Sequence, residues 1–253
     1  MSAIVVCSGK GSPGATFVAV NLATALARAK QNAVLLDLDP AGGDLSCYLG
    51  LDPRRGLYPL LRMEGSVFEP SRLLAEAEER SGFHVVGGFP EASELVSPEV
   101  LGGAFAAARA PDRIVVADIG RVATTNMSIA AQAELVLLVV KADLVSVLGA
   151  ERALRQLEAA GTDRKRIGAV VSGHERRRPA DLAEVGEALR LPIVGAVPAD
   201  RRGARKALIA QQPVGTRRLT RAFDAISTAA RHTLPDAPGE SEAVAPELTE
   251  VSA

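Results

Sequence analysis

Seven residues near the start of the chain have the types and spacing of a loop that binds phosphate. An apolar run, Ala3–Cys7, leads into a glycine-rich turn and then directly into a helical pattern. The turn follows the spacing G-x-x-x-x-G-K-[ST], except that Ala15 stands where the lysine is expected. Backbone N–H groups of such a turn and the start of the next helix attract an anion, although a plain strand-to-helix turn is the alternative. The predicted nucleotide-binding residues are Gly9, Lys10, Gly11, Ser12, Gly14, Ala15 and Thr16.

Two residues of the chain could hold a divalent cation beside this loop. Thr16 has the position whose hydroxyl binds Mg²⁺ in phosphate loops. A second apolar run, Arg113–Asp118, ends in a carboxylate, as does the strand whose aspartate holds Mg²⁺ through water. An aspartate at a strand end is common. Asp118 is a candidate for Mg²⁺ mainly because its strand follows the phosphate loop in the expected order along the chain.

A third segment, Val34–Leu45, is an apolar run followed by D-x-D-P and a glycine turn. Taken alone, its two acids could simply cap a loop. With Lys10, which marks the variant loop K-G-G-x-G-K-[ST], and with the order of the three motifs, the sequence resembles the MinD/ParA family of dimeric P-loop ATPases. The resemblance covers about residues 1–233.

The resemblance implies roles for individual residues. Lys10 would reach across a homodimer to the partner's phosphates, and Asp39 would position the attacking water, which makes these two the candidate catalytic residues. Asp37 would lie near the Mg²⁺ shell, so the candidate metal residues are Thr16, Asp37 and Asp118. The expected cofactors are ATP or ADP with Mg²⁺.

The departures from the family pattern are informative. Ala15 removes the lysine that holds the β- and γ-phosphates, and Pro13 has no N–H to donate. A lost charge-assisted contact costs about 1.5–3 kcal/mol, so we expect binding to survive and hydrolysis to be weak or absent. Ser172 takes the place of an asparagine that reads the adenine in the family. The continuation Gly43–Leu51 is most similar to the CpaE/TadZ pilus-assembly branch.

Apolar runs alternate with helical patterns along the chain. The runs predict an α/β fold, a P-loop NTPase-type three-layer sandwich whose mostly parallel sheet of about seven strands has helices on both faces. Residues 45–82 are less regular and predict a loop plus helices. The expected strands are Ala3–Cys7, Ala33–Leu38, Phe83–Val86, Arg113–Asp118, Leu135–Val140, Ile167–Ser172 and Ile193–Val197. The expected helices are Thr16–Lys30, Pro98–Ala110, Asp143–Ala160, Ala180–Leu189, Gly203–Ala210 and Arg217–His232.

The formal net charge of −1 conceals a segregation of charge along the chain. Residues 1–150 carry −4, residues 151–233 carry +8, and residues 234–253 carry −5. We therefore expect one domain over residues 1–233 and a disordered acidic tail over residues 234–253. A solvated surface or a DNA-binding face would both explain the basic block. Its candidate polyanion-binding residues are Arg176, Arg177, Arg178, Arg201, Arg202, Arg205 and Lys206.

Composition also bounds the location of the protein. No apolar run approaches the roughly 20 residues of a membrane span, and the N-terminus lacks the features of a secretory signal. Two cysteines give neither a disulfide framework nor a metal cluster. An acidic tail would be repelled by anionic lipid, so direct membrane insertion is not expected. We expect a cytoplasmic protein, polar or at the inner face of the membrane through a partner.

The motifs and the charge distribution are compatible with three functions. The first is a homodimeric, hydrolysis-deficient positioning or assembly factor of MinD/ParA/CpaE type, with a protein partner in a pilus, secretion or other polar complex. The second is a ParA-like partitioning protein that binds DNA non-specifically through residues 151–233. The third is an active ATPase that uses Lys10 for the absent lysine.

Overall fold

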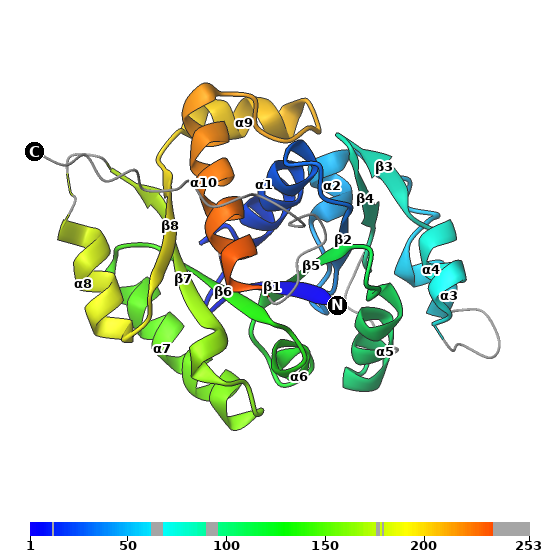
Figure 1. Ribbon diagram of the computed structural model, residues 1–253, viewed down its shortest axis with the longest axis horizontal. Helices are drawn as coiled ribbons and strands as arrows, with labels where there is room; N and C mark the ends of the chain where they lie inside the picture. The colour runs from blue at the N-terminus through cyan, green and yellow to red at the C-terminus, as the bar shows by residue number, and fades with distance from the viewer. Residues whose placement is uncertain (12, 62–67, 90–95, 176–177, 179, 235–253) are drawn as a thin grey trace, which may run out of the picture.

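The apolar runs form one mixed, mostly parallel sheet in the computed structural model (Figure 1). The structure describes residues 1–11, 13–61, 68–89, 96–175, 178 and 180–234. Within them, eight strands lie in the order β3-β4-β2-β5-β1-β6-β7-β8. The strands are β1 (Ser2–Ser8), β2 (Ala33–Asp37), β3 (Glu78–Arg80), β4 (Phe83–Val86), β5 (Ile114–Arg121), β6 (Leu135–Val140), β7 (Ile167–His174) and β8 (Ile193–Pro198).

The helices cover both faces of the sheet, as predicted (Figure 1). Helices α1, α2 and α10 contribute to the apolar cluster on one face, and α3 to α8 contribute to the cluster on the other. None of the described helices combines the length and apolarity needed to cross a membrane. The helices are α1 (Ala15–Arg28), α2 (Leu45–Leu49), α3 (Leu57–Leu61), α4 (Pro70–Ala75), α5 (Pro98–Ala108), α6 (Met127–Ala131), α7 (Leu144–Ala159), η1 (Arg164–Arg166), α8 (Ala180–Leu189), α9 (Arg201–Ile209) and α10 (Arg217–Thr233).

Strand β3 was not among the seven strands expected from the sequence. It pairs antiparallel with β4 at the edge of the sheet, whereas the other neighbouring strands are parallel. Its sequence, Glu78-Glu79-Arg80, contains no apolar residue, so the search for apolar runs missed it. Charged side chains are tolerated there because an edge strand remains partly in water and resists pairing with other chains.

Strand β1 shows how one apolar run serves two cores. All seven of its residues are buried. Ile4 and Val6 belong to the cluster that includes Phe223 of α10, whereas Val5 belongs to the cluster that includes Phe105 of α5. Successive side chains of a strand point to opposite faces, so a continuous apolar run is needed when both faces are covered.

The sheet order places a ligand-binding crevice beside β1. The chain adds β2 and β5 on one side of β1 and then crosses to add β6 and β7 on the other. In such sheets ligands bind beyond the carboxyl ends of the strands where this reversal occurs. The turns after β1, β2 and β5, which carry all three predicted motifs, therefore meet at this end of the sheet.

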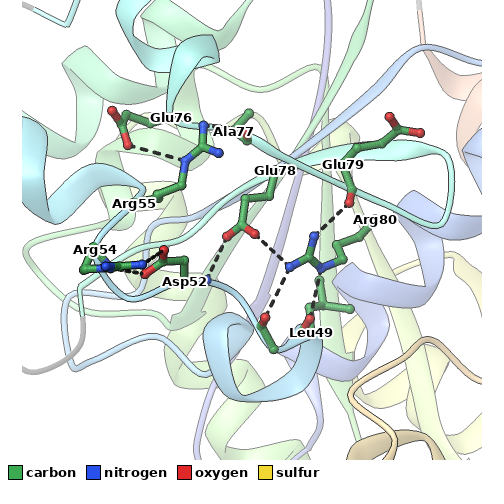
Figure 2. Close-up of polar contacts among 10 residues, drawn as sticks. Leu49, Asp52, Arg54, Arg55, Glu76, Ala77, Glu78, Glu79 and Arg80 are labelled. Atoms are coloured by element: carbon green, nitrogen blue, oxygen red, sulfur yellow. Dashed lines mark hydrogen bonds and ion pairs between the residues drawn. The ribbon is translucent and has the colours of Figure 1, made fainter.

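A polar cluster fixes α2 against the β3 edge (Figure 2). The Arg80 guanidinium donates to the carbonyls of Leu49 (3.2 Å) and Gly50 (3.2 Å) at the end of α2, and to Glu78 (2.7 Å). The other oxygen of Glu78 accepts from the Asp52 N–H at 2.9 Å. Since the terminal carbonyls of a helix have no partner within it, Arg80 completes α2 and fixes its direction.

Candidate nucleotide-binding site

The predicted phosphate loop connects β1 to α1 and is held against α7. At Gly9 a Cβ atom would lie 2.2 Å from the Gly149 carbonyl oxygen, so the two backbones touch and no side chain fits at Gly9. The Ser8 hydroxyl donates to the carbonyls of Lys10 (2.9 Å) and Gly120 (3.2 Å), which ties the loop to the end of β5. The close approach of α7 was not predicted, and a glycine within that amphipathic helix was its one signal.

The turn at the end of the loop leaves the start of α1 without a side-chain cap. Gly14 has φ +94°, in the left-handed region that favours glycine, and α1 starts directly after it with no side-chain cap. The first N–H groups of α1 therefore have no acceptor from a capping side chain. Ala15 is buried in the core cluster under this turn, and Thr16 is half-buried beside it.

Two acidic residues are buried next to each other beyond the loop. Asp37, the last residue of β2, and Asp118, within β5, are register partners, with exposed fractions of 0% and 1%. The Asp118 carboxylate accepts from the Gly120 N–H at 3.0 Å, but its Oδ2 is buried without a hydrogen-bond partner among the described residues. Such an oxygen has a lone pair left to face a hydrated cation.

Burial dominates the titration of both carboxyl groups. It raises the pKa of Asp118 to about 6, where the nearby Thr16 hydroxyl and the Gly120 N–H oppose the rise and the charges of Asp39 and Asp44 add to it. It also raises the pKa of Asp37 well above its usual range, and the charge of Asp118 adds to this. A cation in this place would stabilise the charged forms.

Asp37 was predicted to lie near the Mg²⁺ shell, but its oxygens point to backbone N–H groups instead. They accept from the N–H groups of Asp39 (3.3 Å) and Leu45 (3.3 Å), which fixes the turn between β2 and α2. At Gly43 a Cβ atom would lie 1.8 Å from the Asp37 carboxylate, so the turn wraps tightly around it. This geometry supports a loop-holding role, and a place in a Mg²⁺ shell stays a prediction.

The Asp39 carboxylate lies over Gly120, near the end of β5. At Gly120, whose φ is +60°, a Cβ atom would lie 1.9 Å from the Asp39 carboxylate. The carboxylate also accepts from the Ala41 N–H at 2.9 Å. Burial raises the pKa of Asp39, the hydrogen bond opposes the rise, and the charge of Asp44 adds to it.

A cavity of about 750 Å³ opens beside the loop. It runs from Pro13 and Gly14 past Lys141 to the ends of β7 and β8, where His174 and Asp200 line it. Its size suits a nucleotide, because small-molecule sites generally fall between about 300 and 1,000 Å³. Tyr48, Asp143 and Asp200 also line the cavity and were not predicted as site residues, because the predicted motifs do not include them as ligand-binding positions.

The structure separates the predicted polyanion-binding residues into two groups. Arg178 and Arg201 line the cavity. Arg202, Arg205 and Lys206 are exposed on α9. Arg176 and Arg177 lie outside the described residues, as do Ser12 of the loop and the predicted disordered tail from residue 235 onward. Leu234, which was assigned to that tail, instead packs into the core with an exposed fraction of 7%.

Comparison with known proteins decides the family. Residues 4–214 match the family described as the CobQ/CobB/MinD/ParA nucleotide binding domain. The chain belongs to this family. It is similar to the septum site-determining protein MinD of Thermotoga maritima, with 26% identity over 203 residues, which are 77% of this chain and 74% of that protein.

Two further similarities show the reach of the family resemblance. An uncharacterized protein of Mycobacterium tuberculosis is 30% identical over 207 residues, which are 80% of this chain but 56% of that longer protein. The solved structure of MinD from Pyrococcus horikoshii in complex with Mg-ADP superimposes with a TM-score of 0.73 at 19% identity, covering 89% of this chain and 94% of that one. The latter comparison confirms the predicted fold.

The described residues of this MinD/ParA-family chain fit a nucleotide and Mg²⁺ in part, since Ala15 offers no ammonium group, Pro13 offers no N–H and Ser172 stands in place of an asparagine. The start of α1 and the turn at Gly14 suit phosphate oxygens, and the unpaired Oδ2 of Asp118 beside Thr16 suits hydrated Mg²⁺. No set of three or more His, Cys, Asp or Glu side chains in the described ranges could hold a metal ion alone. The missing cationic group is the lysine at position 15.

Proposed function

We propose that this chain binds ATP or ADP with Mg²⁺, hydrolyses ATP weakly or not at all, and works as a dimeric positioning or assembly factor. The observation that carries the proposal is Ala15 at the start of α1, in a site whose loop, helix start and acidic residues are otherwise in place. Loss of the ammonium contact would weaken binding by about 1.5–3 kcal/mol, which lowers the affinity for nucleotide about ten-fold to a hundred-fold. The loss of stabilisation would be larger for the transition state of phosphoryl transfer, in which further negative charge develops on the phosphate oxygens.

The chain's own groups divide the work of the site. Mg²⁺ supplies positive charge next to the phosphates when it is bound, and Thr16 and Asp118 would hold it. The N–H groups at the start of α1 would orient the phosphates. Asp39, which follows β2 and lies against Gly120 of β5, would hold a water. Lys10 is half-buried in the loop and is the cation that could replace the missing lysine, from this chain or from a second copy.

The surface beside Lys10 supports self-association. At Gly149 of α7 a Cβ atom would lie 3.5 Å from the Lys10 Cβ, so α7 adjoins the loop. The first turns of α7 expose Leu144 (73%), Val145 (61%) and Leu148 (46%). Large exposed apolar side chains next to a ligand site favour a protein contact there. We propose that a second copy covers this apolar surface when nucleotide is bound.

Titration of the purified chain with ATP and Mg²⁺, followed by mass measurement, tests binding and dimerisation together. We expect ATP to shift the mass from one copy to two, and ADP to bind without this shift. Ala15→Lys should tighten ATP binding by about ten-fold or more. Neither binding nor a change of mass would overturn the proposed nucleotide function.

Turnover assays separate this proposal from the active-ATPase alternative. We expect phosphate release near background, and Ala15→Lys to raise it. Clear Mg²⁺-dependent turnover that Lys10→Ala abolishes, while Lys165→Ala at an exposed site leaves it intact, would instead establish an ATPase that uses Lys10.

The partner that we propose is a pilus or secretion machinery, or another polar complex, at the inner face of the membrane. The support is the segment Gly43–Leu51, which is similar to the CpaE/TadZ branch and forms the turn and helix α2 next to Asp39. A fluorescent fusion in the native cells should form polar foci that disappear when the pilus genes are deleted. A uniform distribution in both strains would remove this part of the proposal.

A further inference from the structure

Helix α9 exposes an unusual combination of side chains on one face. Its sequence, RRGARKALI, has four cations and no acid. Arg201, Arg202, Arg205 and Lys206 are exposed, and so are Leu208 (43%) and Ile209 (72%). At about 100° per residue, all six side chains fall within one continuous half of the helix surface. We call these six residues the α9 face.

The opposite side of α9 is packed, so the α9 face must remain outward. Gly203 is buried, and a Cβ atom there would lie 2.5 Å from the Asp200 carboxylate and 2.9 Å from the Thr216 Cγ2. The Thr216 hydroxyl donates to Asp200 at 2.9 Å. These contacts set the start of α10 beside the start of α9, at one end of the molecule (Figure 1).

The start of α10 extends the positive charge. Arg217, Arg218 and Arg221 are exposed there. In the part of the chain that the structure describes, none of these three or of the four α9 cations takes part in a salt bridge. The acid that precedes α9, Asp200, accepts from Gly203 and Thr216, and its carboxylate also feels the charge of Arg218. Seven exposed cations with one acid among them leave this end of the described molecule strongly positive.

We propose that the α9 face is a peripheral docking surface for an anionic lipid bilayer. Charge complementarity draws the cations to the headgroups, and each Lys or Arg near such a surface strengthens binding by roughly five-fold. Leu208 and Ile209 favour lipid over nucleic acid. Aliphatic side chains are stabilised when they are buried at the boundary of headgroups and acyl chains, whereas a hydrated phosphate backbone gives them almost no apolar contact. The helix would lie on the bilayer rather than cross it.

Co-sedimentation with vesicles tests this proposal on the full chain without nucleotide, so the result does not depend on the proposed function. The vesicles contain phosphatidylcholine alone, or equal parts of phosphatidylcholine and phosphatidylglycerol. We expect binding to the anionic vesicles that weakens with salt, and no binding to phosphatidylcholine. Absence of binding to the anionic vesicles at low salt would overturn the proposal.

Two variants separate lipid from other polyanions. The double variant Leu208→Gln and Ile209→Gln should lose about ten-fold in vesicle affinity and retain any affinity for duplex DNA. The triple variant Arg202→Gln, Arg205→Gln and Lys206→Gln should lose roughly a hundred-fold on vesicles. Arg152→Gln with Arg155→Gln, which removes two exposed cations from α7, is the control and should change little.

The outcomes are distinct. Unchanged vesicle binding by the double variant would overturn the lipid assignment, and tight binding to duplex DNA with none to vesicles would make this end of the molecule a nucleic-acid surface. Since all five substituted side chains are exposed, circular dichroism and thermal unfolding should match the unaltered chain. A variant that unfolds early is replaced by its single substitutions, starting with Ile209→Gln.

Discussion

Asp37 and Asp118 place two carboxyl groups beneath the phosphate loop with almost no access to water. The fold tolerates them because burial favours their neutral forms, and because Asp37 is held by two backbone N–H groups. At neutral pH a cation would allow both groups to ionise. The isolated chain therefore carries an electrostatic cost that is relieved when the site is filled.

The pH dependence of stability should reveal this cost. The folded chain holds the Asp118 proton up to a pKa of about 6, against 3.8 for the free group, so stability falls as pH rises through that window. The penalty at pH 7 is about 3 kcal/mol. In urea unfolding with chelator present, Asp118→Asn should be more stable than the unaltered chain at pH 7, by up to this amount, and equal to it near pH 4.

Asp112 provides the control for this experiment. It is exposed, and its pKa is lowered by its bond with Arg113. Asp112→Asn should therefore give no gain in stability at pH 7. A difference between Asp118→Asn and the unaltered chain that is the same at pH 4 and pH 7 would contradict the assigned cause.

Two glycines of the phosphate loop should respond differently to a methyl group. Gly9→Ala would drive Cβ into the backbone of α7, so we expect a loss of about 2 kcal/mol or more in unfolding free energy and loss of nucleotide binding. In Gly11→Ala the added Cβ has no described atom within 4 Å outside its chain neighbours, so the unfolding free energy should change little. Urea unfolding of both variants measures the contrast; equal losses would contradict the packing described here.

Sequence alone could predict the members of the site but not its contacts. The loop, Asp39 and Asp118 follow from spacing, since the motif and the strand ends lie within short windows. The contact of Gly9 with Gly149 joins segments far apart in the chain, and a glycine within the α7 pattern does not by itself identify its partner. The direction of the Asp37 oxygens depends on how the turn closes around Gly43, which composition does not determine.

At the scale of elements, the strands and long helices were predicted to within a few residues because each carries its own apolar periodicity. Helix α8 and strands β4 and β6 have the expected bounds. Helix α9 starts at Arg201 rather than Gly203, since Asp200 caps it by accepting from the Gly203 N–H at 2.8 Å. Residues 45–82, predicted as a loop plus helices, do contain α2, α3 and α4. The bounds of these short helices and the presence of strand β3 depend on tertiary contacts, so sequence could not predict them.

Helix α2 tests how much such contacts contribute. Arg80→Ala removes the two carbonyl contacts at its end and the pair with Glu78, so we expect a loss of about 1–2 kcal/mol in unfolding free energy (Figure 2). Arg54→Ala, in the same cluster, removes a guanidinium that is 88% exposed and pairs with Asp52, and should be near neutral. Equal effects in urea unfolding would mean that α2 does not need this anchor.

At the scale of the whole molecule, the charge is arranged by position as well as by sequence. The acidic N-terminal part supplies the buried aspartates of the nucleotide site, and exposed cations of the basic part gather around α9 and the start of α10. Residues 235–253 add five acids to the same chain. We propose that they compete with anionic surfaces for these cations.

Deletion of residues 235–253 tests this competition. The deletion stops after Leu234, since this side chain belongs to the core. We expect binding to anionic vesicles to strengthen on the order of three-fold at low ionic strength, with the gain disappearing at high salt. Equal affinity at low salt with and without the tail would assign its acids to solubility alone.

The central place of β1 also has a consequence for how the protein is made. Ser2 of β1 pairs with Ile114 of β5, and Ile4 pairs with Leu135 of β6, so β1 waits after its synthesis for partners that are translated much later. At typical elongation rates this delay is on the order of ten seconds. During translation a wholly apolar segment is thus free to pair wrongly, and nascent chains shorter than β5 should depend on chaperones to remain in solution.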